Sequence, residues 1–155
     1  MARTIVIGVG SSILTDDAVG LVLARKLRDM LAGRDDVVFA ENEEGGFTLL
    51  EEALGYDRLV VIDAARFGGE IGSLRRLELA DLGPAIHAGF PHRMDLATVM
   101  EFGRKAHLAV PSEVTVYAVQ IGDAASFGES LTPELEERVE ALAAEIRADA
   151  FPQQA

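Results

Sequence analysis

Residues 8–20 of the chain read Gly8-Val9-Gly10-Ser11-Ser12-Ile13-Leu14-Thr15-Asp16-Asp17-Ala18-Val19-Gly20. The β-branched run that leads into them, Thr4–Val9, is typical of a central parallel strand buried on both faces. A loop of small residues follows and ends in two adjacent acids, Asp16 and Asp17, at the expected start of a helix. A helix N-terminus stabilises carboxylates, so a helix cap accounts for one acid of the pair. The second acid indicates a ligand, because open α/β sheets bind ligands at the carboxyl ends of their strands.

Strands and helices alternate along the rest of the chain. The expected strands are Thr4–Val9, Val37–Ala40, Arg58–Ile62, Ser73–Leu79 and Glu113–Val119, and the expected helices are Asp17–Leu31, Phe47–Leu54, Asp95–His107 and about Thr132–Arg147. This order predicts an α/β fold, a three-layer α/β/α sandwich around a mostly parallel sheet of about five strands. We expect residues 1–150 to form a single domain and residues 151–155 to form a loose tail.

Composition narrows the class of protein. The 155 residues are 49% hydrophobic, which suits one compact core, and the net charge is −12. An acidic surface argues against nucleic acid and anionic membranes as partners, because these bind clusters of Lys and Arg. The chain has no cysteine, so disulfides, thiolate metal sites and a Cys nucleophile are excluded. The absence of a signal-like or membrane-spanning apolar run leads us to expect a cytoplasmic protein, and we expect a monomer.

Three residues are candidates for one site. Right-handed crossovers bring the carboxyl ends of the parallel strands to one edge of the sheet, so Asp17 and Asp63 are expected to meet there. His92 lies in a long loop, residues 80–94, that is also a candidate for function. Two carboxylates and one imidazole form a ligand set that suits zinc and nickel alike and leaves a coordination position open. Helix capping and solvated loop positions are the structural alternative for the two acids.

Two other classes of protein share part of this pattern. The Gly8-Val9-Gly10 turn lacks the third glycine of a dinucleotide fingerprint, because position 13 is Ile13. A phospho-receiver signalling domain also has an acid pair after its first strand and an Asp after its third. It would need a Lys after the last strand, where this chain has Gln120-Ile121-Gly122-Asp123, and it has no use for His92.

The motifs resemble those of the hydrogenase maturation endopeptidases. Residues 8–20 are similar to that family's opening pattern, G-x-G-N-x-L-x-x-D-[DE]-x-x-G, with Ser11 in place of the usual Asn. Val61-Ile62-Asp63-Ala64 resembles the family's apolar-Asp-Ala element, and Phe90-Pro91-His92 resembles its [ST]-P-H loop. Leu131-Thr132-Pro133 looks like the G-L-[ST]-P element before the last helix, and the resemblance covers about residues 3–147.

This resemblance implies a function. Members of the family remove a C-terminal extension from the large-subunit precursor of a nickel-iron hydrogenase once nickel has been inserted. It implies that Asp17, Asp63 and His92 contact a nickel ion supplied by that precursor, with Asp16 as a capping and orienting residue. Glu41 stands where the family has an Asp, so it is a candidate accessory residue. A non-cleaving relative that only binds the precursor is the alternative, because residues 41–46 depart from the family pattern.

Overall fold

The computed structural model describes residues 2–81, 96–122 and 126–153. Their strands are β1 (Thr4–Val9), β2 (Val37–Asn42), β3 (Arg58–Ala65), β4 (Leu74–Glu78) and β5 (Glu113–Gln120). Their helices are η1 (Thr15–Ala18), α1 (Val19–Met30), α2 (Phe47–Ala53), η2 (Leu79–Asp81), α4 (Leu96–Lys105), α5 (Pro133–Glu136) and α6 (Val139–Ala150). The two elements marked η are short 3₁₀ helices.

The strands form one five-stranded sheet in the described part of the chain, with the order β2-β1-β3-β5-β4. Neighbouring strands are parallel except that β4 runs antiparallel to β5. The predicted mostly parallel sheet is therefore confirmed. Its order also differs from the order 2-1-3-4-5 of receiver-type doubly wound folds, which argues against the phospho-receiver alternative.

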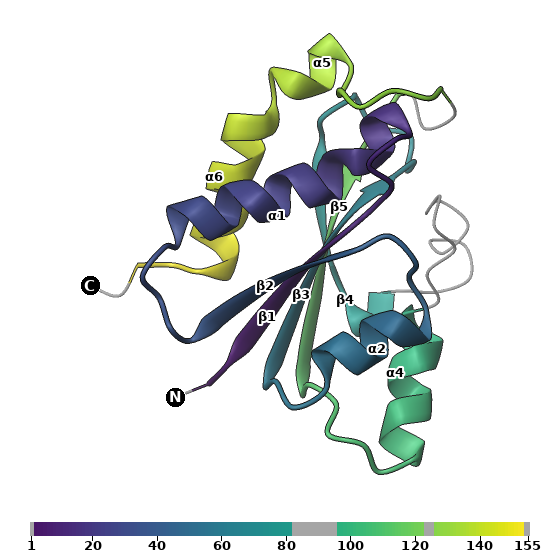
Figure 1. Cartoon of the computed structure of the whole chain (residues 1–155), viewed down its shortest axis with the longest axis vertical. Coiled ribbons are helices and arrows are strands. Elements are labelled where there is room, and N and C mark those ends of the chain that lie inside the picture. The colour runs from purple at the N-terminus through teal and green to yellow at the C-terminus, as the bar shows by residue number, and fades with distance from the viewer. Residues whose placement is uncertain (1, 82–95, 123–125, 154–155) are drawn as a thin grey trace.

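Helices cover both faces of the sheet, as Figure 1 shows. The alternation of side chains along each strand sends Val60 and Ile62 of β3 toward the layer of α1 and α6. Leu59 and Val61 of the same strand point to the opposite layer, where α2 and α4 pack. This arrangement is the predicted three-layer α/β/α sandwich.

The structure of the C-terminal region differs from the prediction in two places. The expected last helix is divided into α5 and α6, because the N–H of Arg138 bonds back only three residues, to Leu135, and tightens the turn. The side chain of Arg138 reaches across to the carbonyl oxygen of Gly72 at 3.3 Å. The tail expected to be loose from residue 151 begins instead with a buried side chain, since Phe151 is only 5% exposed.

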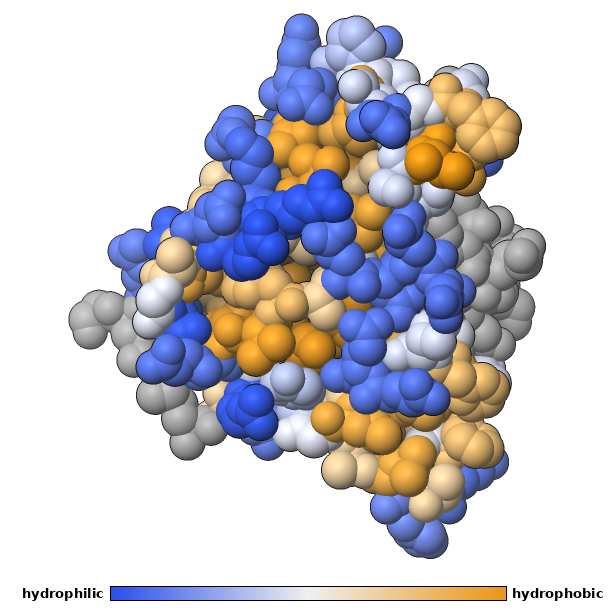
Figure 2. Space-filling view, in the orientation of Figure 1, coloured by the Kyte–Doolittle hydropathy of each residue, from blue (hydrophilic) through white to orange (hydrophobic). Residues whose placement is uncertain are grey.

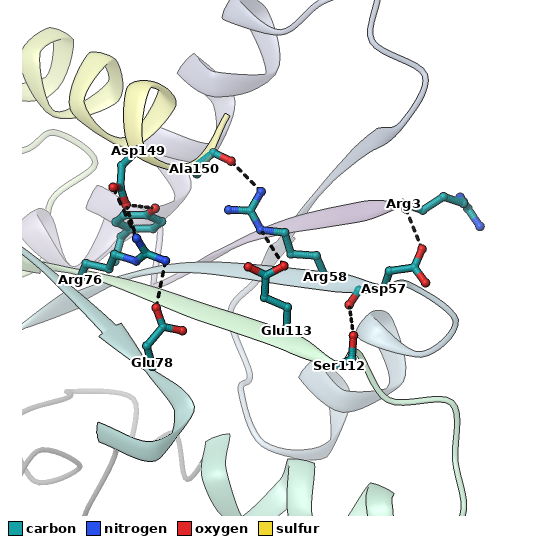
Figure 3. Close-up of polar contacts among 10 residues, drawn as sticks. Arg3, Asp57, Arg58, Arg76, Glu78, Ser112, Glu113, Asp149 and Ala150 are labelled. Carbon is teal, nitrogen blue, oxygen red and sulfur yellow. Dashed lines mark hydrogen bonds and ion pairs between the residues drawn. The ribbon is translucent and has the colours of Figure 1, made fainter. Parts of the chain in front are cut away.

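Arginine side chains hold that first tail residue in place. The guanidinium carbons of Arg34 and Arg58 lie 5.5 and 5.2 Å from the centre of the Phe151 ring. Figure 3 shows Arg58 between the carbonyl of Ala150 and the carboxylate of Glu113, with a donor–acceptor distance of 2.6 Å to Ala150. The end of α6 is thereby fastened to the amino-terminal edge of the sheet.

Helix α1 approaches the sheet unusually closely at Gly20. A Cβ atom at this position would lie 2.3 Å from the carbonyl oxygen of Ile62 and 2.4 Å from that of Val9. The backbone of α1 therefore rests directly on the carboxyl ends of β1 and β3. Gly20 is required for this contact, which brings η1 and its two acids next to the end of β3.

We expect Gly20→Ala to lower the free energy of unfolding by about 3 kcal/mol, because the new methyl group would collide with two backbone carbonyls. Without the collision, Gly20→Ala would instead raise the free energy of unfolding by about 1 kcal/mol, because alanine is favoured over glycine in a helix. Urea unfolding followed by circular dichroism measures the difference. Gly103→Ala in α4 is the comparison, because there the new Cβ would meet the side chains of Val110 and Leu50 rather than backbone carbonyls. A Gly20→Ala protein as stable as the wild type would contradict the contact.

Candidate functional site

Asp17 lies in η1, directly before α1, and is only 1% exposed. Its Oδ2 accepts a hydrogen bond from the backbone N–H of Ser11 at 3.2 Å. The glycine loop folds back onto η1 in the same place, since a Cβ on Gly10 would lie 2.2 Å from the carbonyl oxygen of Asp17. The loop of small residues after β1, which is not a dinucleotide-binding fingerprint, therefore folds around Asp17.

Asp16 is also fully buried, and it joins three separate segments. Its Oδ1 accepts a hydrogen bond from the backbone N–H of Thr132 at 2.7 Å, and its Oδ2 accepts one from the Thr132 hydroxyl at 3.0 Å. The N–H of Gly122 donates to the same Oδ2 at 3.2 Å. The N-cap residues of η1 and α1 are Leu14 and Ala18, and neither forms a side-chain cap hydrogen bond, so the capping role expected of Asp16 stays a prediction. Asp16 ties the end of β5 and the start of α5 to the loop that carries Asp17.

Asp63 lies in the central strand β3 and is 0% exposed. Its Oδ1 accepts a hydrogen bond from the N–H of Ala64 at 2.8 Å. Alternation along β3 places it on the same face as Val61 and Ala65, the face covered by α2 and α4. Because Gly20 contacts the carbonyl of Ile62, the residue before Asp63, the start of α1 and Asp63 meet at the same edge of the sheet.

His92, the third predicted ligand, lies outside the described residues. Within residues 2–81, 96–122 and 126–153, no group of three or more histidine or acidic side chains is close enough to hold a metal ion. The predicted ligand set of Asp17, Asp63 and His92 therefore stays a prediction. The two carboxylates that belong to it are both buried, and carboxylate oxygens are among the ligands that divalent metals accept.

Glu41, the candidate accessory residue, forms an ion pair with Arg25 of α1. Its two carboxylate oxygens accept hydrogen bonds from the Arg25 guanidinium at 2.9 and 2.6 Å. These hydrogen bonds hold the pKa of the Glu41 carboxyl below its usual value of 4.5. The carboxylate is thus ionised and already engaged at the surface of α1, and its accessory role stays a prediction.

The structural role of Asn42 was not predicted from the sequence. This buried side chain accepts hydrogen bonds from the N–H groups of Glu44 and Gly45 at 3.0 and 2.6 Å, and it donates one to Glu52 of α2 at 2.5 Å. Its backbone carbonyl also accepts a bond from Gly10 at 3.1 Å. The available signal was an Asn followed closely by a pair of glycines, a combination typical of a side-chain-stabilised turn. Asn42 therefore shapes the 41–46 loop and joins it to the glycine loop.

Fold and site together define an α/β protein with buried aspartates at the carboxyl edge of a mostly parallel sheet. The sequence matches the family model described as hydrogenase maturation protease over residues 21–149. The chain belongs to the hydrogenase maturation protease family. The family resemblance found in the sequence is thereby confirmed.

Solved structures agree with this assignment. The chain is 26% identical to the hydrogenase maturating endopeptidase HybD from E. coli, with a TM-score of 0.81 over 95% of this chain and 91% of that one. The maturation protease HycI from Thermococcus kodakarensis is 27% identical, with a TM-score of 0.73 over 94% of this chain and 90% of that one. A comparison with curated protein sequences gave no significant match. In the described part of the chain, every helix is too short or too polar to cross a membrane.

We expect Thr132→Val to lower the free energy of unfolding by about 2 kcal/mol, because it removes the hydroxyl donor to the buried Asp16 carboxylate. Thr132→Ser keeps that donor and is expected to cost less than about 1 kcal/mol. Chemical denaturation of the two variants measures the contrast. Equal losses for valine and serine would show that the hydroxyl does not stabilise Asp16.

The Arg25–Glu41 ion pair gives a pH-dependent prediction. Because the folded-state pKa of Glu41 is lowered, its contribution to stability is present above the unfolded-state value of 4.5 and is lost as the pH falls through the lowered pKa. The pair is largely exposed, so Glu41→Gln should cost about 0.5 kcal/mol at pH 7 and less at an acidic pH below the lowered pKa. Urea unfolding at the two pH values measures this change. A cost that does not shrink at the lower pH would contradict the ion-pair role.

Proposed function

We propose that this protein is an endopeptidase that removes the C-terminal extension of a nickel-loaded large-subunit precursor of a nickel-iron hydrogenase. Asp17, Asp63 and His92 contact the precursor's nickel, which belongs to the substrate. Membership of the hydrogenase maturation protease family supports the reaction class. The observation that carries the proposal is that Asp17 and Asp63 are both buried, in two elements that meet at one edge of the sheet.

The donor chemistry fits a borderline divalent metal. Carboxylate oxygens and an imidazole nitrogen are suitable ligands for nickel. Ser11 and Ala64 each donate a backbone N–H to one of the two carboxylates, and these bonds fix the orientation of Asp17 and Asp63 before the substrate arrives. Preorganised ligands of this kind avoid the cost of ordering side chains on binding.

The proposed reaction is hydrolysis of one peptide bond. Water adds to the scissile carbonyl, the C–N bond breaks, and the proton from water passes to the departing amine. A carboxylate of this chain accepts the proton from water as general base. The nickel ion of the substrate supplies polarisation of the carbonyl oxygen. The cut depends on nickel because Asp17, Asp63 and His92 recognise the metal and thereby position the adjacent peptide bond.

Cleavage of the purified nickel-loaded precursor, followed by mass spectrometry of the released peptide, tests the proposal. We expect Asp17→Asn, Asp63→Asn and His92→Ala each to slow cleavage at least about a hundredfold, and nickel-free precursor to stay intact. Asparagine preserves the size of each buried aspartate, and circular dichroism verifies that the variants fold. Asp29→Asn, an exposed site on α1, is the matched control and should cleave at the wild-type rate.

The outcomes separate the proposal from its alternative. Wild-type cleavage that persists in all three site variants would overturn the assignment of the site. Precursor binding without any wild-type cleavage would identify a non-cleaving relative instead. That alternative has one structural argument, because Glu41 replaces the family's Asp and is bound to Arg25.

A further inference from the structure

Two short segments far apart in the sequence are joined beside the aspartates. Residues 13–15 and 126–128, here called the clip, meet in a parallel bridge between Leu14 and Gly128. The N–H of Gly128 donates to the carbonyl of Ile13 at 2.8 Å, and the N–H of Thr15 donates to the carbonyl of Gly128 at 3.0 Å. The Thr15 hydroxyl adds a bond to the carbonyl of Ser126 at 2.6 Å. The clip is therefore a defined structure rather than two independent loops.

The clip presents large apolar side chains to solvent. Phe127 is 82% exposed and Ile13 is 50% exposed. The two residues are neighbours in space, because Gly128, the residue after Phe127, donates its N–H to the carbonyl of Ile13. Figure 2 shows apolar side chains at the end of the molecule where α1 begins. Such an exposed apolar patch on an acidic protein marks a surface for binding a partner.

The clip is held rigidly against the aspartates. Thr15 has a φ of 49°, in the left-handed region that β-branched residues rarely adopt, and its bonds to Ser126 and Gly128 keep it there. The next residue, Asp16, is bound to Gly122 and Thr132, which flank the other half of the clip. A partner that docks on Ile13 and Phe127 is thus placed in a fixed relation to Asp17, four residues from Ile13.

We propose that Ile13 and Phe127 form the docking surface for the folded body of the hydrogenase precursor, beside the bond to be cut. This inference rests on the proposed function, since it takes its partner from it. The exposed side chains of Glu43 and Glu129 border the surface, and the Glu43 carboxylate accepts a hydrogen bond from the N–H of Ser12 at 2.8 Å. The complementary surface of the precursor is accordingly an apolar recess flanked by Lys or Arg side chains.

A second exposed aromatic pair provides the matched control. Phe47 of α2 and Phe102 of α4 are 55% and 51% exposed, and their rings pack edge to face with centroids 5.2 Å apart. They lie on helices that cover the other face of the sheet from α1 (Figure 1). Phe102→Ala removes the same kind of side chain without touching the clip.

The test measures the affinity for the nickel-loaded precursor and the steady-state cleavage kinetics of Phe127→Ala, Ile13→Ser, Phe127→Leu and Phe102→Ala. We expect Phe127→Ala to weaken binding and raise KM about tenfold with kcat unchanged, as is typical of an apolar interface anchor. Ile13→Ser should act in the same direction, and Phe127→Leu should retain most of the affinity. Phe102→Ala should bind like the wild type. Phe127 is so exposed that unfolding midpoints should not change.

Each outcome decides the inference. Unchanged affinity in Phe127→Ala and Ile13→Ser, or an equal loss in Phe102→Ala, would overturn the docking surface while wild-type cleavage still supported the proposed function. A wild-type protein that binds but does not cleave would contradict the proposed function, and the affinities of the variants would still decide the docking surface. A wild-type protein that neither binds nor cleaves would overturn both.

Discussion

The close approach of α1 to the ends of β1 and β3 is the constraint on which the site depends. Gly20 allows it, because at this position the space for a side chain is occupied by the carbonyl oxygens of Val9 and Ile62. Gly8 and Gly10 make similar contacts with Gly20 and Asp17, so the strand, the loop and the helix are interlocked through backbone atoms. Side chains can rotate out of a contact, but backbone carbonyls cannot. The two aspartates are therefore held by the rigid part of the fold.

The two adjacent acids have different structural roles because their carboxylates meet different partners. Asp16 is surrounded by donors from Gly122 and Thr132 and fastens distant segments together. Asp17 accepts a hydrogen bond from the backbone N–H of Ser11 and belongs to the edge where Asp63 also lies. Burial of both carboxylates costs free energy that hydrogen bonds must offset. This cost of burial is explained if Asp16 organises the loop and Asp17 has its proposed role in binding the substrate's metal.

Much of the fold and part of the candidate site were predictable from the sequence, for physical reasons. The runs of apolar residues marked the strands, and the rule that parallel strands end at one edge brought Asp17 and Asp63 together. The antiparallel direction of β4 was not predictable, because the pattern of a strand does not encode its direction. The roles of Gly20, Asn42 and Phe151 depend on tertiary neighbours, so residue types alone left them undecided or gave the wrong expectation. His92 lies outside the described residues, and its place in the ligand set stays a prediction.

We propose that this chain contacts the nickel of its substrate directly. X-ray absorption at the nickel edge, on the precursor alone and on its complex with Asp63→Asn, tests this contact, because the variant is expected to cleave slowly and retains Asp17 and His92. We expect additional oxygen or nitrogen ligands on nickel in the complex, and their loss when Asp17 and His92 are also replaced. Identical nickel spectra for the free and bound precursor would contradict it.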